Sequence, residues 1–155
     1  MTEVDRILDH YDRAMHGHAW HGDSLWKILK GISPRQAATH VDPKAHNIWE
    51  LVAHMTFWET QVYRRLNHLP DRSAVKRNFP PTPDATAKNW NLTLDEFRKS
   101  NYDFRVAVSE LNTSRLNQPL PGRKMPAYVE VHGVIQHNLY HAGQIALLRK
   151  IVAAK

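Results

Sequence analysis

Apolar residues recur every three or four positions along most of the chain, which is the periodicity of amphipathic helices. The first such stretch covers residues 3–14, and the pattern resumes briefly over residues 25–29 before it fades at Gly31. Residues 33–46 are predicted to be a connector, because Pro43 and the short polar side chains there disfavour a continuous helix.

A second long helix is predicted to open at Asn47 and to run to residue 66. Asn47 and Glu50 have the spacing of a capping box, with Asn in place of the usual Ser or Thr. The apolar positions that follow keep the helical period: Ile48, Leu51, Val52, Met55, Trp58, Val62 and Leu66. Residues 67–82 contain three Pro and several basic residues, and they are predicted to form a loop.

Thr82 and Pro83 predict the start of a third helix, since Thr is a common N-cap and Pro is favoured at the first helical position. This helix is predicted to run to about residue 112, with an interruption or a bend at residues 91–93. Residues 113–125 contain Pro and Gly and are expected to form a loop, and a fourth helix is predicted from Pro126 almost to the end. No strand pattern of alternating residues occurs. Four long amphipathic helices predict an all-α fold, a four-helix bundle, and the two longer loops permit a crossover connection.

The composition narrows the class of protein. A chain of 155 residues predicts a single domain over residues 1–155. The absence of cysteine excludes disulfides, thiolate metal sites, iron–sulfur clusters and a cysteine nucleophile. No apolar run reaches the length of a membrane span, and the first five residues are polar and acidic, unlike a signal peptide. We therefore expect a cytoplasmic protein with no membrane partner.

Two of the eleven histidines, His137 and His141, are four residues apart and so share one face of the fourth predicted helix. Val134, Ile145 and Leu148 flank that face, which should therefore point inward. Two unpartnered imidazoles there would cost about 1–3 kcal/mol each. A divalent ion held by both Nε2 atoms at about 2.0–2.1 Å would satisfy them. The alternative is a pair of core histidines bonded to the backbone or to water.

His54 is the candidate third ligand. It lies in the middle of the second predicted helix on the same stripe as Leu51 and Trp58, so it should also point inward. Together with His137 and His141 it would form a three-histidine site on facing helices. Three nitrogen ligands leave positions open for water or substrate, as in catalytic zinc sites. Such an ion lowers the pKa of a bound water or polarises a bound oxygen or thiolate.

Other polar residues are expected near this site. Gln144 shares the face of the His pair and is expected either to orient a ligand or to make a bundle hydrogen bond. His46 is expected at the mouth of a pocket, and Glu50 is a candidate general base, although helix capping also explains it. His132 lies about 140° around the helix from His137 and should not share the site. Six further histidines are expected on the polar surface or in loops: His10, His16, His18, His21, His40 and His68.

Several catalytic motifs are missing from the chain. It has no His-Glu-x-x-His, no Glu-x-x-His, no Gly-rich phosphate loop and no Gly-x-Ser-x-Gly. Their absence disfavours a zincin-type protease, a di-iron bundle, a phosphate-loop enzyme and an α/β-hydrolase.

Two segments resemble the DinB/YfiT-like family. Residues 137–150 read HNLYHAGQIALLRK, which is similar to the C-terminal helix of that family, and residues 46–55 read HNIWELVAHM, which is similar to the segment that holds its first ligand. The likeness extends over nearly the whole chain. It implies an up-down-down-up four-helix bundle with a long crossover between the second and third helices. It also implies a divalent metal, commonly nickel or zinc, held by three histidines that fall on His54, His137 and His141.

The resemblance further implies a homodimer and metal-dependent thiol transfer or hydrolysis. The predicted function is therefore a metal-dependent enzyme, a thiol S-transferase or hydrolase, whose ion activates water or a low-molecular-weight thiol. Because the chain has no cysteine, any thiol must arrive with the small-molecule substrate. The alternative is a non-catalytic metal-binding or dimerisation module. Nucleic-acid binding is disfavoured, because a net charge of +6 and a basic loop at residues 65–77 come with no nucleic-acid motif.

Overall fold

The computed structural model describes residues 1–73 and 77–154, and within them it is all-helical, with no strand. This confirms the predicted all-α class. Four helices are long: α1 (Glu3–His16), α4 (Ile48–Leu66), α5 (Ala87–Ser109) and α7 (Ala127–Ala153). Three are short: α2 (Leu25–Leu29), α3 (Pro34–Ala38) and α6 (Thr113–Leu116).

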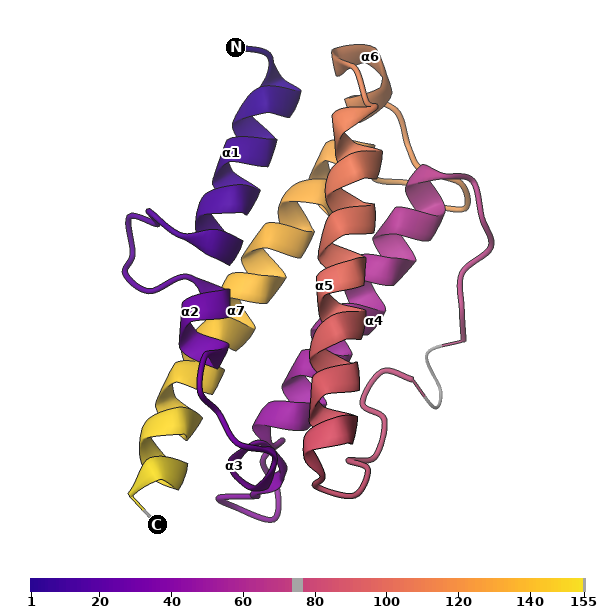
Figure 1. Ribbon diagram of the computed structural model, residues 1–155. Helices are drawn as coiled ribbons and strands as arrows, with labels where there is room; N and C mark the ends of the chain where they lie inside the picture. The colour runs from indigo at the N-terminus through magenta and orange to yellow at the C-terminus, as the bar shows by residue number, and fades with distance from the viewer. Residues whose placement is uncertain (74–76, 155) are drawn as a thin grey trace.

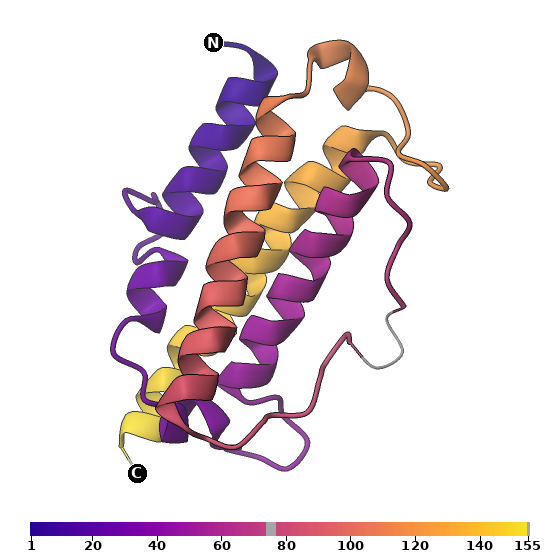
Figure 2. The same ribbon diagram turned by 45° about the vertical axis from the view of Figure 1, so that its right-hand side comes forward.

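The four long helices lie side by side (Figure 1). Helices α4 and α5 run in the same direction, opposite to α1 and α7, so that α5 begins at the end of the molecule where α4 begins (Figures 1 and 2). Helix α4 packs against both α5 and α7, and α2 continues the line of α1 along α7. In the part of the chain that the structure describes, no helix is both long enough and apolar enough to cross a membrane.

The start of α4 is the predicted one. The Asn47 side chain accepts a hydrogen bond from the Glu50 N–H at 2.8 Å, and the Glu50 carboxylate accepts one from the Asn47 N–H at 3.1 Å. This reciprocal capping box satisfies two of the N–H groups that a helix start leaves without partners. The capping box therefore places the first turn of α4 as the sequence indicated.

The predicted start of the third helix is wrong by four residues. The N-cap of α5 is Thr86, whose hydroxyl accepts a hydrogen bond from the Asn89 N–H at 3.2 Å. The hydroxyl of Thr82 accepts instead from the Asn47 side-chain amide at 2.9 Å, which joins this loop to the start of α4. Thr82 is thus engaged in a tertiary contact rather than in a cap, and Pro83 precedes the helix.

The expected interruption at residues 91–93 does not occur, because α5 runs through them without a break. The Thr93 hydroxyl donates to the Asn89 carbonyl at 3.2 Å and accepts from the Trp49 indole N–H of α4 at 2.9 Å. Thr93, one of the two polar residues of this triplet, is therefore bonded within α5 and across to α4. At its other end α5 stops at Ser109, three residues before the predicted limit.

The connectors predicted at residues 33–46 and 113–125 each contain a short helix. Ser33 and Gln36 form a capping box for α3, and Pro34 occupies the first turn, where the missing N–H of Pro costs nothing. The Asn112 side chain accepts from the Arg115 N–H at 2.9 Å and caps α6. These helices are five and four residues long, too short for an apolar period to reveal them.

One buried carboxylate joins all four long helices. Glu59 of α4 is fully buried, and its oxygens lie 2.9 Å from the Tyr11 hydroxyl of α1 and 2.7 Å from the Asn138 amide of α7. Ser100 and Asn101 of α5 lie 2.8 Å and 2.6 Å from it. Sequence pattern does not reveal this polar cluster, because the partners of Glu59 are 41 to 79 residues away from it along the chain.

Candidate metal centre

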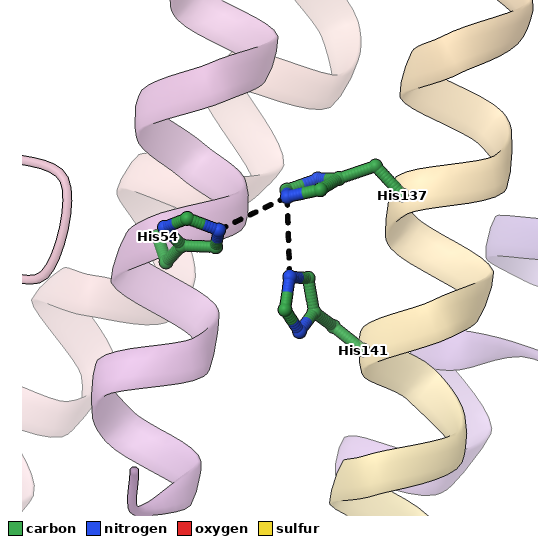
Figure 3. A group of neighbouring side chains, drawn as sticks. All are labelled: His54, His137 and His141. Atoms are coloured by element: carbon green, nitrogen blue, oxygen red, sulfur yellow. Dashed lines mark hydrogen bonds between the residues drawn. The ribbon is translucent and has the colours of Figure 1, made fainter.

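The packing of α4 against α7 brings together the three histidines that the sequence singled out (Figure 3). The Nε2 atom of His137 lies 3.0 Å from Nε2 of His54 and 3.1 Å from Nε2 of His141. One ligand atom from each ring lies within 4.8 Å of the other two. His54 and His141 are buried, and His137 is partly buried. The three rings therefore converge on one point between the helices.

The separations suit a small divalent ion. Metal–nitrogen bonds of about 2.0–2.1 Å place two imidazole nitrogens on one ion about 3 to 3.5 Å apart. The donor set consists of imidazoles alone, which suits zinc, nickel, copper and iron better than magnesium or calcium. Within residues 1–73 and 77–154 this is the one group of three or more His, Asp or Glu side chains whose ligand atoms come so close.

Two of the rings are held by hydrogen bonds on the side away from this point. The His54 Nδ1–H donates to the Asn78 backbone carbonyl at 2.7 Å, and the His141 Nδ1–H donates to the Gln144 side-chain oxygen at 2.6 Å. A carbonyl oxygen can only accept, so each neutral ring carries its proton on Nδ1 and a lone pair on Nε2. Each lone pair therefore faces the common point, as metal-ligating histidines require.

Burial keeps these histidines neutral. It lowers the pKa of His54 to about 4, and burial together with the two neighbouring imidazoles lowers the pKa of His137 to about 4. The pKa of His141 is lowered as well, chiefly by burial. At neutral pH all three rings are uncharged and their nitrogen lone pairs are free to bind a cation.

Phe79, from the loop after α4, supports the ring of His54. Phe79 stacks on His54 with centroids 3.9 Å apart and on His46 with centroids 3.7 Å apart. The Trp58 indole N–H donates to the Asn78 side chain at 2.9 Å. Asn78 and Phe79 were not identified from the sequence, since a backbone carbonyl and a loop aromatic carry no signal of a site.

Two cavities reach the histidines from opposite directions along the seam between α4 and α7. One, of about 430 Å³, is lined by His141, Gln144 and His46, so His46 lies where the sequence placed it. The other, of about 480 Å³, is lined by His137 and Trp58. A small molecule in either cavity would lie against a ring of the cluster.

Glu50 caps a helix, and His132 lies outside the cluster. The Glu50 carboxylate accepts the Asn47 N–H and lies 3.0 Å from Nδ1 of His46, so capping accounts for it. His132 lies 3.8 Å from Glu3 of α1, away from the cluster, as its helical position indicated.

The sequence model of the DinB superfamily matches residues 18–145, a span that includes all three clustered histidines. Comparison with curated proteins finds no match.

Proposed function

The chain belongs to the DinB superfamily, and on this premise we propose that it is a metal-dependent enzyme, a thiol S-transferase or hydrolase, in which His54, His137 and His141 hold a zinc or nickel ion. The observation that carries the proposal is the convergence of three neutral Nε2 atoms at 3.0 and 3.1 Å. The Nε2 lone pairs of His54 and His141 both face Nε2 of His137, which carries at most one hydrogen and can satisfy only one of them, whereas a single cation can be bound by all three nitrogens.

We also propose that residues 1–155 form a single domain with the up-down-down-up four-helix topology. The parallel course of α4 and α5 supports it, because two consecutive parallel helices need a connection that returns along the molecule (Figure 2). This crossover supplies Asn78 and Phe79, the two residues that hold His54. The topology and the site are thus linked through one loop.

The residues around the cluster suit a small substrate. When bound, the ion would lower the pKa of a thiol or of water. The Gln144 side chain and the Asn78 carbonyl would hold the rings of His141 and His54 in place during the reaction. The cavities of about 430 and 480 Å³ lie within the size range of about 300–1,000 Å³ typical of small-molecule sites. Lys44, which forms no ion pair with any described residue, lines the first cavity and would favour an anionic thiol.

The second candidate function is a non-catalytic metal-binding or dimerisation module. An exposed apolar row on α7 favours it: Tyr140, Leu147 and Ile151 are 66%, 62% and 38% exposed. We propose that this row is the contact surface of a homodimer. Nucleic acid remains a disfavoured partner, because Arg65, the first residue of the basic stretch 65–77, lies in α4 and is buried in ion pairs with Asp71 and Glu130. Lys76 of that loop lies outside the described residues.

Elemental analysis of the purified protein tests the ligand set. We expect about one zinc or nickel ion per chain, and loss of that ion in the double variant His137→Ala, His141→Ala. His132→Ala is the matched control, because His132 lies on the same helix outside the cluster. Unchanged metal content in the double variant would contradict the assignment of these ligands.

A turnover assay separates the two candidate functions. Metal-loaded protein is screened with low-molecular-weight thiols and electrophiles, and with hydrolysable esters and amides, beside the double variant. Turnover that disappears with the metal supports an enzyme. Full metal content without turnover of any thiol–electrophile pair, ester or amide supports the non-catalytic module.

A further inference from the structure

A cavity of about 760 Å³ lies between α2 and α5, on a side of the bundle that the histidine cluster does not reach. Helix α4 is on the far side of α5 from α2 (Figure 2). Helices α1 and α2 and the turn after α2 form one wall, and α5 forms the other. The walls are mainly apolar, with Trp26, Leu29 and Ile32 facing Trp90 and Leu94. None of the clustered histidines lines it, so its occupant is independent of the proposed metal chemistry.

The charge of this cavity is one-sided. No Asp or Glu lines it, whereas Lys30, Arg98 and Arg105 do. Arg98 pairs with Asp95 at 2.7 Å and Arg105 pairs with Asp12 at 2.9 Å, so both are neutralised from outside the cavity. Lys30 forms no ion pair with any residue that the structure describes. One positive charge is therefore left without a partner beside an apolar surface.

The floor of the cavity is polar and held in place. Tyr11 and Asn101 line it, and both are buried. Their side chains donate to the Glu59 carboxylate at 2.9 and 2.6 Å, and Asn101 also accepts from the Trp26 indole N–H at 3.0 Å. The Arg98 guanidinium lies 4.6 Å from the centre of the Trp26 ring. The aromatic wall is thus positioned before any ligand arrives, which reduces the entropic cost of binding.

We propose that this cavity binds a small amphipathic monoanion, a molecule with one carboxylate on an apolar body. The carboxylate lies beside the Lys30 ammonium, and the apolar body lies against Trp26 and Trp90. The volume is that of a small-molecule site, and the single uncompensated cation sets the ligand charge at one. Apolar burial supplies most of the affinity, and the ion pair selects the anion over neutral analogues.

The test uses decanoate as the probe, with decanol and decyltrimethylammonium as neutral and cationic analogues, in titration calorimetry of the metal-loaded protein. Decanoate is expected to bind saturably with one site per chain and more tightly than either analogue. Lys30→Gln should weaken decanoate binding about two- to five-fold, the range of a solvent-accessible ion pair, and leave decanol binding unchanged. Lys88→Gln, an exposed lysine of α5 outside the cavity, is the matched control and should have no effect.

A second pair of variants locates the ligand. Asn91 is exposed and lines the cavity, so Asn91→Trp should narrow the cavity and weaken decanoate binding. Leu92→Trp, on the next, outward position, should not. His137→Ala should leave decanoate binding intact, whatever becomes of the metal.

Three outcomes would overturn the proposal. Equal affinity for decanol and decanoate would show an apolar groove without anion selectivity. Loss of decanoate binding in His137→Ala but not in Asn91→Trp would place the ligand at the histidine cluster. A monodisperse dimer in light scattering that Asn91→Trp converts to monomer would show that a second copy of the chain covers the cavity.

Discussion

The clustered histidines are held by different kinds of partner. His54 donates to a backbone carbonyl, which no side-chain substitution removes, whereas His141 donates to the side chain of Gln144. The orientation of His141 therefore depends on one replaceable group. This difference makes Gln144 the residue through which the role of the supporting hydrogen bonds can be measured.

Gln144→Leu should weaken zinc or nickel binding about 10- to 100-fold, since it leaves the ring of His141 free to rotate and to change its tautomer. Competition against a chromophoric chelator measures the affinity. Gln136→Leu, an exposed position on the same helix, is the control and should bind the metal as the wild type does. Metal affinity in Gln144→Leu equal to that of the wild type would show that the hydrogen bond to His141 has no role in metal binding.

Acid should destabilise the metal-free protein. The pKa values of His54 and His137 are about 4 in the folded chain and near 6.5 in an unfolded one, so between these values the unfolded chain binds more protons. The contribution of these residues to the free energy of unfolding is complete above pH 6.5 and is lost as the pH falls toward 4. Urea unfolding of chelator-treated protein at pH 7 and pH 5 measures the loss.

The comparison needs a reference, because burial raises the pKa of Glu59, which makes an opposite contribution that diminishes as the pH rises. The double variant His54→Ala, His137→Ala retains Glu59 and removes the two histidines. Its stability should fall less between pH 7 and pH 5 than that of the wild type. An equal fall in both proteins would refute the link to these rings.

At the scale of single elements, local side chains decide where most helices begin. Asn47, Ser33 and Asn112 each cap the helix that follows, and Asn47 was identified from its spacing to Glu50. Thr82 and Thr86 both precede plausible helix starts, and only the tertiary contact of Thr82 with Asn47 distinguishes them. A cap can therefore be recognised locally, but the choice between two neighbouring caps is made by the rest of the fold.

Thr86→Ala should lower the free energy of unfolding by about 1 kcal/mol, because it removes the cap of α5. Thr113→Ala is the control, as Thr113 is an exposed threonine whose hydroxyl makes no hydrogen bond to a described residue. Chemical denaturation of both variants measures the difference. A loss in the control as large as that in Thr86→Ala would argue against the cap.

At the scale of the whole molecule, a polar cluster and an apolar face set how the helices pair. The Glu59 carboxylate contacts α1, α5 and α7 at once, and such a buried network favours one mutual arrangement of helices over others. The exposed apolar row on α7 is the proposed contact between two copies of the chain.

Glu59→Ala should lower the free energy of unfolding by about 3 kcal/mol or more, since it leaves several buried donors without an acceptor. Glu59→Gln keeps the volume and one oxygen and should cost less. Should the alanine variant fail to fold, the glutamine variant still gives a measurable shift in thermal midpoint. Wild-type stability in both would show that the cluster adds nothing to the fold.

Leu147→Asp should convert the proposed homodimer to a monomer, because it places a charge in the centre of the α7 row. Light scattering across a range of protein concentrations measures the mass. Leu92→Asp, on an exposed leucine of α5, should leave the dimer intact. A wild-type protein that is monomeric at all concentrations would contradict the proposed homodimer.

Much of this molecule follows from sequence pattern alone. The 3.6-residue period located all four long helices, and the spacing of His137 and His141 put both rings on one face. The stripe shared by His54, Leu51 and Trp58 pointed the third ring inward. These features are local, because helix periodicity depends on residues within one or two turns of each other.

Tertiary structure alone decided the rest. The approach of α4 to α7 set the 3.0 Å between His54 and His137, and the loop after α4 brought the Asn78 carbonyl and Phe79 to the back of His54. The Glu59 cluster and the cavity between α2 and α5 likewise join residues from distant parts of the chain. Such contacts depend on how whole helices pack against one another. A backbone carbonyl is also the same in every residue, so neither periodicity nor residue spacing could predict these contacts.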